Sequence, residues 1–306
     1  MKKIILILII ISSICIQENY GQQDPQYTQY MYNMNIINPA YAGSRETLSI
    51  GILGRSQWVG LNGAPKTLTF SAHAPFSQSV GLGFSAIADE NGPVKEQNLY
   101  ADFSYTLQTS EEGRLAFGLK GGITLKDIGL FSLTTVETSD PAFNDNVNST
   151  NPNFGAGAFY YTDKFYVGLS IPNILEVSHL KTENGRITDV SEQMHYFITG
   201  GYVFDLTSTL KFKPSTMIKA VSGVPISMDL SANFLFNKKL ELGASYRLDD
   251  SVSGLITFQI ARGFRIGYAY DYTTSNLGEF NDGSHEAFLL WDIFDTDKDI
   301  KSPRFF

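Results

Sequence analysis

The stretch that decides the fold is residues 226–236, which read ISMDLSANFLF. Apolar residues stand at every even position from Ile226 to Phe236, while Asp229, Asn233 and two serines stand between them. Successive side chains of a strand point to opposite faces, so this stretch predicts a strand with one apolar face and one polar face. Tilted strands of about 9–11 residues cross a bilayer, and this stretch is long enough to do so.

The same alternation recurs along most of the chain. It predicts fourteen strands, at about residues 47–55, 66–74, 79–89, 97–107, 114–126, 153–161, 164–171, 194–205, 208–220, 226–236, 239–248, 252–261, 263–272 and 284–293. The eighth strand is ambiguous because both of its faces carry apolar residues. The ninth is weakened by Pro214, because proline cannot donate to a ladder. Charged residues of the ninth, tenth, eleventh and thirteenth strands fall on the polar face, as a lipid-facing apolar surface requires.

The predicted connections alternate between short and long. The short set comprises 75–78, 109–113, 162–163, 206–207, 237–238 and Arg262, and the longer set includes 56–65, 90–96, 127–152, 172–193 and 273–283. Two members of the longer set, near Gly223 and Asp250, are short. Outer-membrane barrels have short periplasmic turns and longer external loops, so the pattern predicts an all-β, antiparallel transmembrane barrel of about fourteen strands. A row of soluble β-sandwiches is the alternative, but no linker divides the chain.

The first residues predict export. A basic start and a short apolar run indicate a signal peptide over residues 1–21, and Cys15 within it is the one cysteine of the chain. A lipoprotein would acylate that cysteine, but the bulky Ile14 before it disfavours this processing. With the amino terminus in the periplasm and an even strand count, both ends of the chain are expected on the short-turn side. The predicted organisation is a signal peptide at 1–21, a periplasmic or plug segment at 22–46, a barrel at 47–293 and a periplasmic tail at 294–306.

Composition and charge exclude some partners. The formal net charge is −8, and no basic tract is present, which argues against nucleic acid. Aromatic residues make up 13% of the chain and there are 27 glycines, both of which suit a membrane barrel with aromatic girdles.

No constellation of residues predicts catalysis, a cofactor or a metal. The four histidines are far apart in the sequence, at His73, His179, His195 and His285. The acids from Asp295 to Asp299 resemble the start of a calcium loop but lack its glycine and its final glutamate, so a solvated acidic tail is favoured. Gly155 and Gly157 are read as small residues at a crowded wall, because no helix follows them to make a phosphate loop.

The segment before the first strand is unusual for a periplasmic tail, since it is rich in Tyr, Met, Asn and Pro. Aromatic and methionine side chains are enriched in interfaces. We therefore expect this segment to fold into the lumen as a plug or to bind a periplasmic partner, with packing on the barrel rim as the alternative. Trp58, in the first external loop, is expected to be an interfacial anchor or a contact for cargo or for loop packing. The candidate residues are Asp24, Pro25, Gln26, Tyr30, Asn38, Pro39, Tyr41 and Trp58.

Three motifs carry a family resemblance. They are QDPQYTQYMYN at residues 23–33, NPAYAG at 38–43 and RSQWVGLNGAPKT at 55–67, and the ending SPRFF at 302–306 is a fourth, weaker feature. Together they closely resemble the PorP/SprF family of the type IX secretion system in the Bacteroidetes. The resemblance is dense over residues 23–76 and thin over the rest of the chain.

The resemblance implies a non-enzymatic outer-membrane protein without a cofactor. It implies a role in the secretion or cell-surface attachment of large cargo, such as gliding adhesins with a C-terminal sorting domain. It also implies contact with outer-membrane lipids and with periplasmic or lipoprotein components of the machinery. Two alternatives from other classes are an outer-membrane channel for small or hydrophobic substrates, like a fatty-acid transporter, and a barrel phospholipase.

Overall fold

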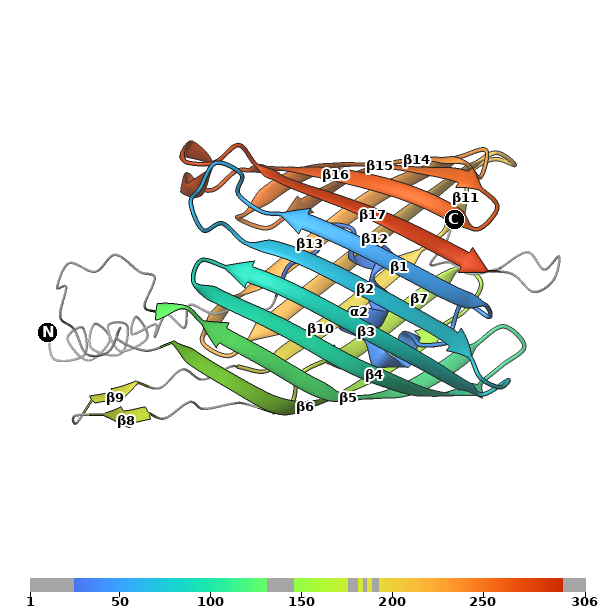
Figure 1. Ribbon diagram of the computed structural model, residues 1–306. Coiled ribbons are helices and arrows are strands. Elements are labelled where there is room, and N and C mark those ends of the chain that lie inside the picture. The colour runs from blue at the N-terminus through green and yellow to red at the C-terminus, as the bar shows by residue number, and fades with distance from the viewer. Residues whose placement is uncertain (1–24, 131–145, 176–180, 184–185, 189–192, 294–306) are drawn as a thin grey trace, which may run out of the picture.

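The computed structural model describes residues 25–130, 146–175, 181–183, 186–188 and 193–293, and their strands close into one antiparallel barrel (Figure 1). The barrel strands are β1 (Leu48–Ser56), β2 (Lys66–Pro75), β3 (Val80–Asn91), β4 (Val94–Gln108), β5 (Arg114–Ile128), β6 (Val147–Tyr161), β7 (Phe165–Ile171), β10 (His195–Tyr202), β11 (Phe204–Asp205), β12 (Leu210–Val221), β13 (Val224–Phe236), β14 (Leu240–Arg247), β15 (Ser251–Ala261), β16 (Phe264–Thr273) and β17 (Ser284–Ile293). A separate hairpin, β8 (Lys181–Glu183) with β9 (Arg186–Thr188), lies between β7 and β10. The short helices are η1 (Tyr30–Tyr32), α2 (Met34–Ile37), η2 (Pro39–Tyr41) and η5 (Asn276–Glu279).

The barrel closes where its first and last strands meet. β1 pairs with β17 from Leu48 opposite Ile293 to Ser56 opposite His285. On the far side β10 pairs with both β7 and β12, and β11 continues β10 after a break at Val203. Closure leaves the fourteen-strand ring without a free edge. A membrane-spanning sheet needs this closure because hydrocarbon offers no hydrogen-bond partner to backbone groups at an edge.

The strands bury their polar side chains and expose their apolar ones, the reverse of a soluble protein. Along β15 the inward Ser251, Ser253 and Thr257 are buried, while the outward Val252 and Ile256 are exposed. The same inversion holds for charge, since the inward charged side chains of the strands are buried and large apolar side chains cover the outer surface. An outward Lys or Arg at mid-bilayer would cost about 2–4 kcal/mol, which explains why the charges point inward. The predicted fold class is confirmed.

The two ends of the barrel are unequal, as the sequence predicted. One end, the short-turn end, carries the connections 76–79, 109–113, 162–164, 206–209, 237–239 and 262–263. The other, the long-loop end, carries 57–65, 129–146, 172–194 and 274–283 together with three tight connections at 92–93, 222–223 and 248–250.

Each predicted strand overlaps one strand of the ring, with two notable corrections at the long-loop end. The predicted loop 90–96 is wrong, because β3 and β4 continue through it to a turn at Gly92 and Pro93. The sixth strand begins at Val147, six residues before its predicted start. In both places most of the residues are polar or charged. They extend the ladder beyond the apolar belt, where a polar outer face carries no penalty.

Pro214 is accommodated by a matching gap in the neighbouring strand. Gly201 pairs with Ser215 and Phe204 pairs with Phe212, so Pro214 lies opposite the break between β10 and β11. At that break the amide of Val203 donates to the carbonyl of Lys164 instead. A residue without an N–H is tolerated there because the ladder is already interrupted.

No helix in the described part of the chain is long and apolar enough to cross a membrane.

Candidate functional site

Residues 25–47, here called the lumen segment, lie inside the barrel and contain η1, α2 and η2 (Figure 1). Nearly all of their side chains are buried, with Tyr30 and Ala40 fully inaccessible. The helices are short because asparagine and proline interrupt them: the Asn38 side chain accepts a hydrogen bond from the amide of Ala40, and Pro39 starts η2.

Toward the long-loop end, the lumen segment is held by what we call the seam clamp, formed by Thr28, Arg55, Asp271 and Glu286. Arg55 on β1 lies 2.7 Å from Asp271 on β16 and 3.1 Å from Glu286 on β17, measured between nitrogen and oxygen atoms. Glu286 also accepts the backbone amides of Thr28 and Gln29, at 2.9 and 2.7 Å. The Thr28 hydroxyl donates to Asp271 at 2.7 Å. The clamp therefore joins the segment to both strands of the closing seam.

A second polar group holds the middle of the segment. The Lys120 ammonium on β5 lies 3.3 Å from Asp102 on β4 and donates to the carbonyls of Asn35 and Ile36 at 3.3 and 3.1 Å. The Asn35 side-chain amide donates to Asp102 at 3.0 Å. The lysine thus satisfies carbonyl groups of α2, which a helix this short cannot satisfy internally.

A third polar group holds the segment at the short-turn end. Arg45 forms a buried ion pair with Asp292 near the end of β17. Ser49 on β1 donates to the same carboxylate at 2.8 Å, and the Thr47 hydroxyl donates to the carbonyl of Ile293. The segment is thus tied to the barrel wall at three levels.

Between these polar groups the segment packs against four inward glycines, here called the glycine groove: Gly81, Gly118, Gly157 and Gly168. A Cβ added at Gly118 would lie 2.1 Å from the backbone nitrogen of Ala40, and one at Gly81 would lie 2.2 Å from the carbonyl oxygen of Ala42. Only a wall without side chains lets the backbone of η2 approach this closely.

Aromatic side chains complete the packing around η1 and η2. The Tyr41 ring makes edge contacts with His73 and Phe159, at centroid distances of 5.3 and 5.5 Å. The Tyr32 ring stacks on Phe288 at 4.4 Å. These barrel residues are apolar or aromatic although they face the lumen, so the inner wall is complementary to the segment.

The structure brings most of the predicted candidate residues into the lumen. Tyr30, Asn38, Pro39 and Tyr41 are buried there, and the Asn38 side chain donates to the carbonyls of Ala158 and Leu169 at 3.1 and 3.4 Å. Asp24 lies outside the described residues, as do Cys15, His179, the acids from Asp295 to Asp299 and the ending SPRFF.

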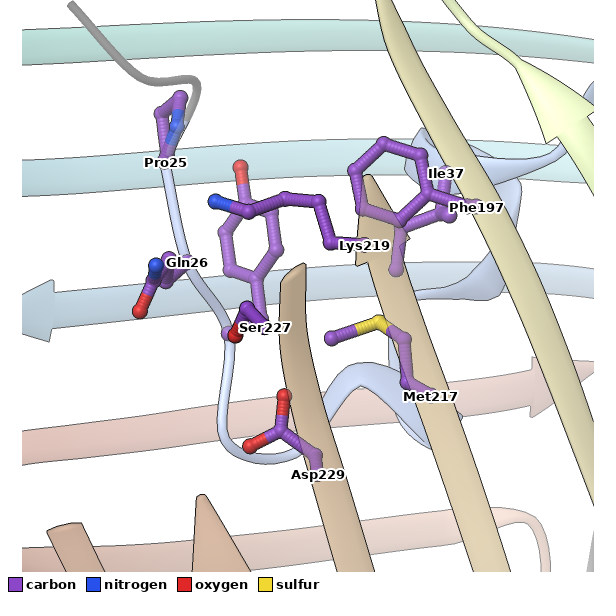
Figure 2. A pocket seen from close by; sticks show the side chains of 9 residues that line it. Pro25, Gln26, Ile37, Phe197, Met217, Lys219, Ser227 and Asp229 are labelled. Atoms are coloured by element: carbon purple, nitrogen blue, oxygen red, sulfur yellow. The ribbon is translucent and has the colours of Figure 1, made fainter. Parts of the chain in front are cut away.

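Pro25 and Gln26 line a small cavity between the segment and the wall (Figure 2). Lys219, Ser227 and Asp229 face it from β12 and β13. Its free space is about 10 Å³, which is about the room that one water molecule needs. The cavity is therefore too small to bind a substrate molecule.

Trp58 lies apart from the segment, in the 57–65 loop. Its amide donates to the Ser284 hydroxyl at 3.1 Å. The neighbouring Val59 exchanges backbone hydrogen bonds with the 274–283 loop, donating to Gly283 at 2.8 Å and accepting from Asp282 at 2.7 Å. The first external loop is therefore docked on the last one.

Sequence reasoning did not single out Arg55, Asp102, Lys120 or Glu286 as a set. The signal was the inward charge on the polar faces of strands, but pairing among distant strands is not visible in the sequence. His73 accepts a hydrogen bond from the amide of Gly43 at 3.2 Å and so has a structural contact. Among the described residues, no cluster of three or more His, Cys, Asp or Glu side chains is arranged to hold a metal ion.

Several solved structures are similar to this chain. The CymD monoaromatic hydrocarbon channel is 12% identical, with a TM-score of 0.52 over 89% of this chain and 94% of that one. A Pseudomonas aeruginosa FadL homologue is also 12% identical, with a TM-score of 0.48 over 90% of this chain and 96% of that one. The Acinetobacter baumannii outer membrane protein Omp33 is 10% identical, with a TM-score of 0.48 over 81% of this chain and all of the other. At such identities the likeness concerns the fold alone.

A search of curated proteins finds no match. By contrast, the sequence profile of the type IX secretion system membrane protein PorP/SprF matches residues 19–291, which cover the lumen segment and nearly the whole barrel. This agrees with the motifs at residues 23–33, 38–43 and 55–67 and with a barrel built for the outer membrane. The chain belongs to the PorP/SprF family of type IX secretion system membrane proteins and is an outer-membrane β-barrel.

Proposed function

We propose that this protein is a non-enzymatic component of the type IX secretion system that supports the secretion or cell-surface attachment of cargo, such as large adhesins with a C-terminal sorting domain. The observation that carries this proposal is that the protein's own chain occupies the lumen. Because the lumen is filled, cargo would not pass through this barrel. The protein would instead bind other components at its outer surface and at its two ends.

The ties between the segment and the wall support a permanent occupant. Removing the segment would leave Glu286, Asp102 and Asp292 facing the lumen without some of their partners. It would also expose the aromatic wall around Phe159 and Phe288 to water. Both changes cost free energy, because the carboxylates lose partners that offset their burial and the aromatic side chains become exposed to water. We therefore assign Tyr30, Asn38, Pro39 and Tyr41 the role of closing the lumen.

The two rims are the places for partners. Periplasmic or lipoprotein components of the machinery would contact the short-turn end, and cargo would contact the long-loop end, where Trp58 lies in the docked 57–65 loop. Pro25 and Gln26 precede η1 and belong, in this proposal, to the surface offered to partners at the long-loop end. Asp24, which lies outside the described residues, stays a predicted partner contact.

The test is a comparison of surface proteins in cells with and without the gene. Intact cells are treated with a membrane-impermeant biotin reagent, and the captured proteins are quantified in the wild type, a deletion strain and the complemented strain. We expect large proteins with the C-terminal sorting domain to disappear from the captured set on deletion and to return on complementation. An unchanged captured set would contradict the proposal.

A channel for small or hydrophobic substrates is the second candidate, because the fold is shared with a monoaromatic hydrocarbon channel. The filled lumen opposes it. Purified protein in planar bilayers should show no steady ionic conductance, and liposomes carrying it should take up a monoaromatic probe such as toluene no faster than empty liposomes. Steady conductance or protein-dependent uptake, together with an unchanged surface proteome, would favour the channel.

A further inference from the structure

The lumen segment runs through the barrel in a definite direction, and its first residues lie toward the long-loop end. Gln26 lines a cavity with Lys219 and Ser227, a cross-strand pair that lies three residues before and four residues after the 222–223 turn. Thr28 contacts Asp271, the third-last residue of β16, and Glu286, the third residue of β17. All of these positions belong to the long-loop half of their strands.

The last residues of the segment lie at the opposite end. Arg45 pairs with Asp292 and Thr47 bonds to the carbonyl of Ile293, where β17 ends and β1 begins. Between the two ends, Asn38 reaches the carbonyls of Ala158 and Leu169, which lie near the 162–164 turn. The segment therefore descends from the long-loop end to the short-turn end before β1 turns back through the membrane (Figure 1).

The side chains at the long-loop end of the segment are accessible. Pro25 and Gln26 keep partly exposed side chains there. At the short-turn end Ser44 and Arg45 are 4% and 2% exposed, whereas Glu46 beside them is exposed and pairs with Arg114. A reagent that reaches the long-loop end can therefore meet the side chain at position 26.

We infer that the lumen segment enters the barrel from the cell exterior, so that its amino-terminal end is presented on the outer surface of the cell rather than in the periplasm. Long loops of outer-membrane barrels face outward, which fixes the direction. This differs from the expectation drawn from strand parity, which placed the amino terminus on the short-turn side. The parity argument holds for β1 itself, but the segment before β1 crosses the lumen once more.

The seam clamp fixes this end of the segment to the wall. It joins Thr28 of the segment to Arg55 on β1 and Glu286 on β17, the two strands that close the ring. The inference does not depend on which cargo the protein serves.

Accessibility of introduced cysteines tests the inference, because the one cysteine of the chain, Cys15, lies in the predicted signal peptide. Gln26→Cys is compared with Asn62→Cys in the 57–65 loop and Glu112→Cys in the 109–113 turn, both exposed positions. Intact cells are treated with a maleimide that carries a polyethylene glycol chain too large to pass general porins, and the remaining thiols are then labelled with a fluorescent maleimide after denaturation. We expect loss of most of the fluorescence for Gln26→Cys and Asn62→Cys, and no loss for Glu112→Cys until the outer membrane is permeabilised.

Protection of Gln26→Cys in intact cells, followed by reaction after permeabilisation, would mean entry from the periplasm and would overturn the inference. Protection in both conditions would mean a sealed long-loop end and would overturn it as well. Folding of each variant is checked by the faster migration of the unheated barrel in SDS gels. If Gln26→Cys fails this check, an epitope inserted directly before Pro25 is probed with antibody on intact cells: binding supports the inference, and binding only after permeabilisation refutes it.

Discussion

Replacing Gly118 on β5 with alanine tests the packing of the lumen segment on the wall. The added Cβ would lie 2.1 Å from the nitrogen of Ala40 and 2.4 Å from the carbonyl carbon of Pro39. Both atoms belong to the backbone of η2, so no side-chain rotation relieves the contact. The segment must move away from the wall.

The cost follows from two contributions. Overpacking a well-packed interior costs about 1–3 kcal/mol. Moving η2 also strains the hydrogen bond from Asn38 to the carbonyl of Ala158, now 3.1 Å long, and a lost bond of this kind costs about 1 kcal/mol. We therefore expect Gly118→Ala to lower the free energy of unfolding by about 2–4 kcal/mol.

Gly254→Ala on β15 is the matched control. A Cβ at Gly254 meets nothing within 4 Å, and alanine in a strand is favoured over glycine by about 0.5–1 kcal/mol. The assay is denaturant unfolding of the protein refolded in lipid vesicles, followed by tryptophan fluorescence, since Trp291 lies on the lipid face. Equal unfolding midpoints for Gly118→Ala and Gly254→Ala would refute the assignment of η2 to the glycine groove.

Three further substitutions are measured in the same way or by fractionation. Arg55→Ala leaves two buried carboxylates without their cation and should lower the free energy of unfolding by about 3–5 kcal/mol. Lys95→Ala, the control, breaks an exposed pair and should lower it by at most about 1 kcal/mol. Similar losses for the two variants would contradict the seam clamp. Lys120→Met removes the partner of Asp102 and the donor to α2, so the midpoint should fall, and a raised or unchanged midpoint would show that the lysine does not hold the segment. Leu119→Arg puts a charge on the lipid face at a cost of about 2–4 kcal/mol, so less folded barrel should reach the outer-membrane fraction; wild-type yield would argue that this face does not meet lipid.

The barrel was predictable because lipid imposes a period of two on every strand that crosses it. The alternation from Ile226 to Phe236 and the inward placement of Lys120 express the same constraint, and a reader of the sequence can apply it strand by strand. The prediction failed at residues 90–96 for the same physical reason. Beyond the apolar belt both faces of a strand can be polar, so the charged residues that continue the ladder lack the alternation and their sequence predicts a loop.

The arrangement inside the barrel could not be derived in this way. Asn38 and Gly157 are separated by more than a hundred residues, and only the closed ring brings them together. The sequence did indicate that the segment is rich in interface-forming residues and that Gly157 lies at a crowded wall, and the structure places the two against each other. What the sequence lacked was a repeating pattern in residues 25–47, because short helices fitted to one particular wall follow the shape of that wall.

Hydrogen–deuterium exchange of the protein in lipid tests the central claim most directly, because it measures whether residues 28–42 belong to the folded core. Backbone carbonyls within this range accept the amides of Tyr32, Asn33, Ile36, Asn38, Tyr41 and Ala42. The Asn38 side chain accepts the amide of Ala40, and Glu286 accepts those of Thr28 and Gln29. Peptides covering this range should exchange as slowly as peptides from β15 and β16. Complete exchange within seconds, as in a free tail, would show that the lumen is not filled by the segment and would contradict the account.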